Sequence, residues 1–392
     1  RAEPIWHIFG AGNPDDWRLA LTDTSTSVGT SRSRRLRVGI LFGGRSGEHE
    51  VSLVSARGII NAIDKDRCEV VPIGITKEGR WVVGDDAWHA LSTGEGLADL
   101  ETVSVTLDSA THPADQAAGE GFRLQALDVV FPVLHGPYGE DGTVQGFMEM
   151  LGLPYVGAGV MTSAVAMDKA IARHIFAARG LPMLPYRLFL SRAWEADPAQ
   201  VIRECESALQ YPMFTKPSNL GSSVAVSKVR NRAELEAGLA EAARYDRKVI
   251  VEQGIEAREI EVSVLGNDTR IVSVPGEIIP SREFYSYAAK YLDNASKLLI
   301  PAPLTAAQTE TVQHLALEAC AAVDCAGMAR VDFLMDKHTG EIWLNEINTI
   351  PGFTPISMYP KLWEASGIGY ADLIDRLIHL ALERHQDLQR SA

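Results

Sequence analysis

Cysteine is scarce in this sequence of 392 residues, and its four cysteines have no spacing typical of a metal-binding motif. A chain of this length can bury a large core without disulfide or metal cross-links. No uninterrupted apolar run approaches the roughly 18 residues of a membrane-spanning helix. These absences exclude a disulfide scaffold, argue against a membrane-spanning protein and favour the reducing cytoplasm as its location.

Positive charge is also in short supply, because 37 lysines and arginines face 51 acidic residues, a net charge of −14 at pH 7. Such a protein repels nucleic-acid backbones and anionic membranes at long range. We therefore expect neither nucleic acid nor a membrane as a partner. Hydrophobic residues make up 46% of the chain, which is typical of a globular protein, here with two or three domains.

Two common nucleotide-binding motifs are missing. The pattern GxxxxGK[ST] occurs nowhere, and no GxGxxG follows the first predicted strand. The sequence therefore disfavours a P-loop NTPase and an ordinary NAD-dependent Rossmann enzyme.

Regular structure is predicted from residue 36 onward. The preceding residues 1–35 lack a sustained periodic pattern and an apolar signal core, so we treat them as an N-terminal extension and do not expect an exported precursor. Alternating strands and helices then predict a parallel sheet with helices on both faces, whose ligands bind in the loops after Phe42 and Leu134. The predicted elements are strands at 36–42, 69–75 and 127–134, a glycine turn at 43–47, a helix at 48–64 and a peripheral segment at 84–120.

The second half of the chain begins near Gly157. A helix over residues 162–179 is predicted first, closed by Gly180. Residues 211–217 and a strand through Val226 then form a predicted hairpin whose tip, residues 218–223, is rich in glycine and serine. From Gln253 the sequence is rich in strands, and it ends in a predicted helix over 371–385.

The strongest chemical signal is a pair of predicted strands, residues 328–334 and 342–348. Side chains alternate along a strand, so Arg330 and Asp332 share one face, and Glu346 and Asn348 share a face of the other strand. If the strands pair, three oxygen donors of the kind that Mg²⁺ prefers come together. A solvated sheet face with incidental charges is the alternative.

Other residues are ambiguous when each is taken alone. The hairpin tip 221–223 behind Lys216 could cover a polyphosphate or be an ordinary turn. Lys169 could be a surface lysine. Glu50 could complement the dipole of its helix, and His135 lies in a glycine-rich loop at a strand end. Residues 284–291 contain three tyrosines and a lysine, which could form a lid or cover apolar surface.

Together these motifs resemble the ATP-grasp superfamily and, within it, the D-alanine–D-alanine ligase family, from Arg37 to about His385. No motif is decisive alone, but all occur in the family's order. The motifs are residues 41–52, 135–142, 167–169, 216–217 with 221–223, 285–291, 330–332 and 345–354.

The resemblance implies an α/β (α+β) ATP-grasp fold. An N-terminal, Rossmann-like parallel-sheet domain would span 36–157, a central ATP-grasp domain 158–252 and a C-terminal ATP-grasp domain 253–385, before a tail of residues 386–392. ATP would lie between the last two domains. The family's habit also suggests a homodimer.

For ATP, the resemblance implies that Lys169 and Lys216 contact the phosphates and that Ser222 and Ser223 cover them. Residues 249–255, ending at Ile255, would line the adenine, with Glu252 receiving its amino group and Glu259 holding the ribose hydroxyls. Two Mg²⁺ or Mn²⁺ ions would be ligated by Asp332, Glu346 and Asn348, in agreement with the strand-face argument.

The implied reaction joins two D-alanine molecules for peptidoglycan synthesis. A carboxylate is a poor acyl donor, so ATP first converts one D-alanine to an acyl phosphate, which the amine of the second attacks. Arg330 and the backbone N–H of Gly352 would stabilise the oxyanion. Glu50, with His135 nearby, would bind the first ammonium group. The second carboxylate would be held by Lys290 and Ser357, and the lid closed by Glu50, Ser222 and Tyr291.

Three rival interpretations are set against this one. A ligase that uses D-lactate or D-serine is the nearest, although Lys290 followed by Tyr291 favours the dipeptide. A silent ATP-binding regulator would have lost one of the groups at 330, 332, 346 and 348, and none is lost. A bicarbonate-activating enzyme would lack Glu50 and Tyr291. The sequence departs from the family pattern beside the hairpin, with Thr215 for the common valine and Ala225 for the common glycine.

Overall fold

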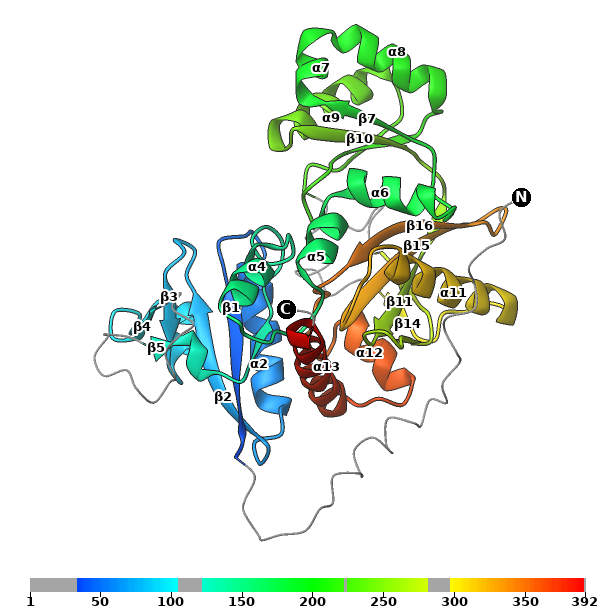
Figure 1. The fold of residues 1–392 in the computed structure, drawn as a ribbon. Coiled ribbons are helices and arrows are strands. Elements are labelled where there is room, and N and C mark those ends of the chain that lie inside the picture. The colour runs from blue at the N-terminus through cyan, green and yellow to red at the C-terminus, as the bar shows by residue number, and fades with distance from the viewer. Residues whose placement is uncertain (1–33, 105–121, 222–223, 281–296, 391–392) are drawn as a thin grey trace. The chain divides into compact units, whose positions relative to one another are not determined.

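Three β-sheets organise the part of the chain that the computed structural model describes, residues 34–104, 122–221, 224–280 and 297–390 (Figure 1). The mixture of sheets and helices confirms the predicted α/β class. In the described residues, no helix combines the length and apolar character needed to cross a bilayer.

The first sheet has the strand order β5-β4-β3-β2-β1-β6. Its centre is parallel as predicted, because β1 pairs in parallel with both β2 and β6. Beyond this parallel centre, β3 and β4 join in antiparallel fashion, and β4 comes from the segment that we expected to be peripheral. The elements are β1 (Leu36–Gly43), α2 (His49–Ala62), β2 (Cys68–Ile75), β3 (Trp81–Val83), α3 (Ala87–Thr93), β4 (Glu101–Ser104), β5 (Phe122–Arg123), a 3₁₀ turn (Leu124–Ala126), β6 (Val129–Pro132) and α4 (Thr143–Met150).

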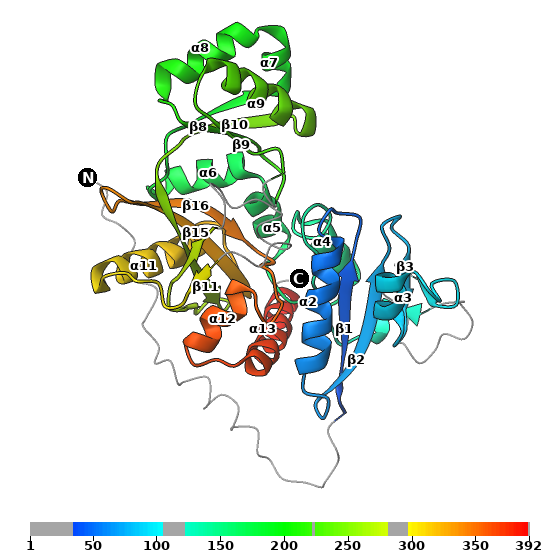
Figure 2. The same ribbon diagram turned by 180° about the vertical axis from the view of Figure 1, so that it is seen from behind.

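The turn after β1 needs glycine. Gly43 has φ of 90°, and a side chain there would meet the carbonyl oxygen of Ile75. The chain can therefore leave β1 sharply and enter α2, which lies along β1 (Figure 2). The hydroxyl of Ser52 in α2 receives the N–H of Gly43 at 2.7 Å, which fixes the helix to the turn.

The second sheet is antiparallel, with the order β7-β10-β8-β9, and helices α7, α8 and α9 pack with it. The predicted hairpin is present as β8 and β9, but its second strand begins at Ser227, beyond the expected Val226. The elements are β7 (Tyr186–Leu190), α7 (Ser191–Ala196), α8 (Pro198–Ala208), β8 (Met213–Pro217), β9 (Ser227–Val229), α9 (Arg232–Tyr245) and β10 (Lys248–Gln253).

The third sheet is also antiparallel, with the order β14-β13-β11-β15-β16 and β12 paired to β11. Helices α11 and α12 pack against its central strand β11. The elements are β11 (Ala257–Leu265), β12 (Ile271–Val272), β13 (Gly276–Ile279), β14 (Lys297–Leu299), α11 (Ala306–Ala322), β15 (Met328–Asp336), β16 (Ile342–Asn348), α12 (Met358–Ala365) and α13 (Tyr370–Arg390).

Hydrophobic cores join segments that are distant in sequence. The core of the third sheet includes Phe176 from the helices that precede β7, and the core around β1 includes Leu377 of α13. The predicted single helix over 162–179 was wrong, because it is two helices, α5 (Val160–Met167) and α6 (Lys169–Ala178). Asp168 separates them, with an extended backbone and a side chain that accepts the N–H groups of Ala170 and Ile171 as the N-cap of α6.

Candidate active site

The predicted acidic strand pair forms as expected. β15 and β16 are antiparallel, with Arg330 opposite Asn348 and Asp332 opposite Glu346. Residues along β15 alternate between buried and half-buried, so the polar residues share the accessible face. The pairing then shifts by one residue after Asp332, which is a β-bulge of the kind found beside active sites.

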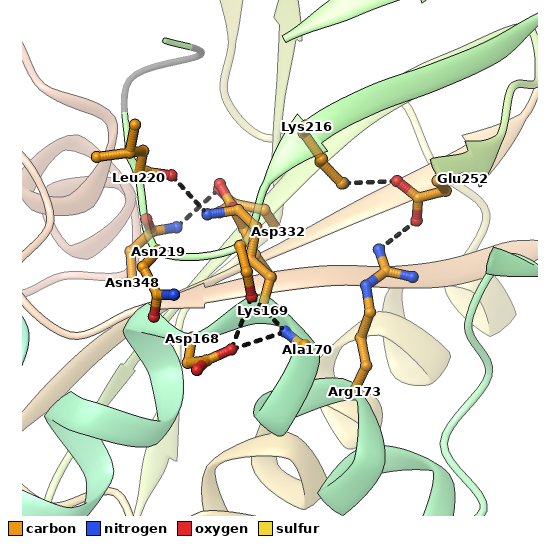
Figure 3. Close-up of polar contacts among 12 residues, drawn as sticks. Asp168, Lys169, Ala170, Arg173, Lys216, Asn219, Leu220, Glu252, Asp332 and Asn348 are labelled. Carbon is orange, nitrogen blue, oxygen red and sulfur yellow. Dashed lines mark hydrogen bonds and ion pairs between the residues drawn. The ribbon is translucent and has the colours of Figure 1, made fainter. Parts of the chain in front are cut away.

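Hydrogen bonds hold the polar groups of this face together. The guanidinium of Arg330 donates to both oxygens of Asp332, at 2.8 and 2.7 Å, and its Nε lies 3.0 Å from Glu261 Oε2. The amide of Asn348 donates to Asp332 Oδ2 at 2.9 Å. Asp332 and Asn348 therefore converge on one point, as Figure 3 shows.

The donor set of this face suits a hard divalent cation. Two carboxylates, Asp332 and Glu346, and the amide oxygen of Asn348 come from neighbouring strands, and all three side chains are half-buried. The described residues contain no group of three or more His, Cys, Asp or Glu side chains arranged for a metal. Two carboxylates and one amide are few protein ligands, which fits Mg²⁺ because it usually keeps water and substrate phosphate in its coordination shell.

Lys169 reaches this face from the start of α6. Its Nζ lies 3.4 Å from Glu346 Oε2 and donates to the carbonyl oxygen of Leu220 at 3.0 Å. The neighbouring Asp168 accepts the Ser218 hydroxyl at 2.7 Å and pairs with Lys248. The residues at the break between α5 and α6 thus connect the loop that follows β8 to the polar face of β15 and β16 (Figure 3).

A second cluster surrounds Glu252, which is 4% exposed on β10. Its Oε2 lies 2.5 Å from Lys216 Nζ on β8, and its other oxygen pairs with Arg173 of α6. Burial alone would raise the pKa of Glu252, but the two cations outweigh it and lower that pKa. For Lys216 burial prevails, and its pKa is lowered.

The remaining residues predicted to contact the nucleotide lie close to this cluster in sequence. Ile255 is half-buried in the short link between β10 and β11, and Glu259 is half-buried on β11 opposite Ile278 and Leu334. Four predicted site residues, Ser222, Ser223, Lys290 and Tyr291, lie outside the described residues.

His135 lies at the carboxyl end of β6 and is 4% exposed. Its Nδ1 hydrogen-bonds with the carbonyl oxygen of Ile350 at 3.1 Å, whereas its Nε2 is buried and has no hydrogen-bond partner among the described residues. Burial lowers the pKa of His135, which favours the neutral form of the ring. A neutral ring with one buried nitrogen unused is suited to a ligand contact.

Two glutamates that were not among the predicted site residues also face this loop. Glu140 accepts the N–H of Gly136 at 2.6 Å, and burial together with the charge of Glu48 raises its pKa to about 8. A methyl group at Gly136 would lie 3.2 Å from Glu48 Oε2, and one at Gly221 would lie 3.7 Å from it. Glu48 therefore lies between the loop after β6 and the hairpin tip.

The structure does not bring Glu50 together with the other predicted site residues. Its side chain is 63% exposed and pairs with Lys77 at 2.6 Å, a contact that lowers its pKa. Glu48 is the N-cap of α2 and Glu50 lies in its first turn, and the surroundings of their side chains differ. No local pattern separates the two, because Glu48 precedes the first helical residue and its neighbours Gly136 and Gly221 come from distant segments.

Gly352 and Ser357 come together in the loop that precedes α12. A methyl group at Gly352 would lie 3.2 Å from Ser357 Oγ, which accepts the N–H of Thr354 at 3.1 Å. The same loop follows β16, so it lies within ten residues of Asn348 in sequence. The structure thus places these two predicted residues side by side at the end of the acidic strand.

Two family models match most of this chain. A family model described as D-ala D-ala ligase N-terminus matches residues 37–158, and one described as D-ala D-ala ligase C-terminus matches residues 175–379. The D-alanine–D-alanine ligase of Heliobacterium modesticaldum is 52% identical over 91% of this chain and 97% of its own. That of Natranaerobius thermophilus is 48% identical over 92% and 98%.

Solved structures are similar over the same span. The D-alanine-D-alanine ligase of Coxiella burnetii has a TM-score of 0.77 and 36% identity, covering 91% of this chain and 96% of that one. The VanG D-Ala:D-Ser ligase of Enterococcus faecalis has a TM-score of 0.78 and 35% identity, covering 89% and 100%. With both family models matched in order and relatives near 50% identity over nine-tenths of its length, this chain belongs to the D-alanine–D-alanine ligase family.

Proposed function

We propose that this protein is an ADP-forming ligase that joins two D-alanine molecules into D-alanyl-D-alanine, for peptidoglycan synthesis. The similarity to ligases of that name over nine-tenths of the chain carries the proposal. The reaction passes through D-alanyl phosphate, because phosphorylation converts the poor leaving oxygen of a carboxylate into a good one.

On the nucleotide side, we assign Lys169 and Lys216 to the phosphates and Glu252 to the amino group of adenine. Ile255 would line the base and Glu259 would hold the ribose. Mg²⁺ or Mn²⁺, when bound, would neutralise phosphate charge and align the transferred group. The residues that would hold two such ions are Asp332, Glu346 and Asn348, whose oxygens lie on one face of β15 and β16.

On the amino-acid side, we move the ammonium-binding role from Glu50 to Glu48. The exposure of Glu50 and its pairing with Lys77 argue against the earlier assignment, and the place of Glu48 beside Gly136 and Gly221 supports the new one. His135 would contact the first D-alanine through its unused Nε2. The acyl group would thereby be oriented for attack by the second amine.

At the reacting carbon, Arg330 and the N–H of Gly352 would stabilise the oxyanion of the tetrahedral intermediate. Arg330 is held in place by Asp332 and Glu261, which supports this role. Ser357, beside Gly352, would bind the carboxylate of the second D-alanine together with Lys290. The predicted roles of Ser222 and Tyr291 in the lid, and of Ser222 and Ser223 over the phosphates, stay predictions.

D-serine as the second substrate is the alternative that one comparison favours, since the VanG ligase is as similar in structure as the D-alanine ligase of Coxiella burnetii. The names of the relatives at about 50% identity support D-alanine instead. A homodimer, a cytoplasmic location and domains at 36–157, 158–252 and 253–385 are further proposals. All four cysteines are free and buried, which suits a reducing compartment.

A product assay tests the proposal. Purified protein with ATP and Mg²⁺ should release phosphate only when D-alanine is present, and D-alanyl-D-alanine should dominate when D-alanine, D-serine and D-lactate compete equally. L-alanine is the matched control and should support no release. Phosphate release that is indifferent to D-alanine would contradict the ligase function, and a mixed product would contradict only the assignment of the acceptor.

A further inference from the structure

Arg173 is the second largest fully buried side chain of the described residues, and neither the motifs nor the proposed mechanism accounts for it. It projects from α6 towards β10, where its Nη2 pairs with Glu252 Oε1 (Figure 3). Its guanidinium also lies over the ring of Tyr186, with Cζ 5.0 Å from the ring centroid. Arginine is seldom buried unless it is paired, and here it shares its only ion-pair partner among the described residues with Lys216.

The cluster around Arg173 carries an unbalanced charge. Two cations, Arg173 and Lys216, share the single carboxylate of Glu252, and the three side chains are 2%, 11% and 5% exposed. The Nε and Nη1 atoms of Arg173 are buried and have no hydrogen-bond partner among the described residues. Buried donors are normally satisfied, so two unused donors indicate that Arg173 is kept here for its contact with Glu252.

The two cations contact different oxygens of Glu252. Arg173 holds one oxygen of Glu252 and Lys216 holds the other, which fixes the carboxylate plane. Each carboxylate oxygen keeps a second lone pair that can accept a hydrogen bond. An ammonium group has three donors, so Lys216 keeps donors for a phosphate while it contacts Glu252.

We propose that Arg173 is a positioning residue that selects adenine nucleotides by holding Glu252 as a fixed hydrogen-bond acceptor for the amino group of the base. The proposal rests on the proposed function, because it takes Glu252 as the adenine contact. Without Arg173, the carboxylate would turn to Lys216 as its only cation. It would then lose its orientation towards the base and occupy the lysine donors needed by phosphate.

Inosine triphosphate is the probe, because it has a carbonyl oxygen where ATP has its amino group. The readout is the ratio of kcat/KM for ATP to that for inosine triphosphate, from phosphate release dependent on D-alanine. In Arg173→Met this ratio should fall about tenfold or more, mainly through a higher KM for ATP. In Arg173→Lys, which keeps the charge without the planar fork, the fall should be smaller but measurable, at about threefold.

Two controls separate positioning from general damage. Arg179→Met makes the same change at the exposed end of the same helix and should leave the ratio unchanged. Glu252→Gln should lower the ratio like Arg173→Met, and the double variant should lower it no further, because Arg173 acts through Glu252. If Arg173→Met does not fold, as judged by circular dichroism, Arg173→Lys and Glu252→Gln carry the comparison.

The outcomes are distinct. Equal losses for the two nucleotides would show a structural role and overturn the proposal, as would an unchanged ratio in Arg173→Lys. Additive losses in the double variant would also overturn it. If the unaltered protein releases no phosphate with D-alanine from either nucleotide, the proposed function itself has failed, and that result is recognised before any variant is compared.

Discussion

The pair Glu48 and Glu50 offers the sharpest test of the site, because the residues are chemically identical and two positions apart. Glu48 is half-buried near Gly136 and Gly221, whereas Glu50 is 63% exposed. Glutamine replaces either carboxylate at nearly constant size and removes only the charge. We therefore expect Glu48→Gln to impair the enzyme strongly and Glu50→Gln to leave it nearly unchanged.

The magnitudes follow from the two environments. A hydrogen bond between a charged carboxylate and an ammonium group in a sheltered site contributes about 1.5 to 3 kcal/mol. Its loss in Glu48→Gln should lower kcat/KM for D-alanine by about 10- to 150-fold. An exposed ion pair such as Glu50 with Lys77 contributes about 0 to 1 kcal/mol, and only to stability. Activity of Glu50→Gln should therefore stay within about twofold of the unaltered protein.

The assay is D-alanine-dependent phosphate release over a range of D-alanine at saturating ATP, with melting temperatures to verify folding. Lys77→Met is a further control, since it breaks the same surface pair from the other side. The reasoning would be refuted if Glu50→Gln lost as much activity as Glu48→Gln, or if the order of the two were reversed.

Three further predictions concern stability and chemistry. Thr215→Val should raise the free energy of unfolding by about 1 kcal/mol, because the Thr215 hydroxyl is buried without a hydrogen-bond partner among the described residues. A lower midpoint of urea denaturation in the variant would contradict this prediction. The pKa of Glu140 is raised to about 8, so between pH 5 and 8 the folded state holds a proton that the unfolded state has lost, and the free energy of unfolding falls as pH rises. Glu140→Gln should reduce that fall by about 1 kcal/mol or more, measured by urea unfolding at pH 5 and pH 8. An equal fall in the variant and the unaltered protein would count against this prediction. Arg330→Ala should lower turnover by about 10²-fold or more, and near-normal turnover would remove its oxyanion role.

Much of the architecture could be predicted because it depends on local patterns. The run of buried residues in β1 and the glycine turn after it have sequence signatures of their own, and the alternation along β15 places its polar residues on one face. The break between α5 and α6 was missed, because an aspartate inside an apolar helical pattern reads as a surface residue until its capping contacts are known.

The sequence by itself determined the family, the order of the elements and the residue types that the chemistry requires, since these depend on motifs and on periods of two and 3.6 residues. Only the tertiary structure decided which of two neighbouring glutamates lies beside Gly136 and Gly221 and that Arg173 meets Glu252, 79 residues further along the chain. The physical reason is that facing and burial are set by contacts between segments distant in sequence, and no local pattern contains them.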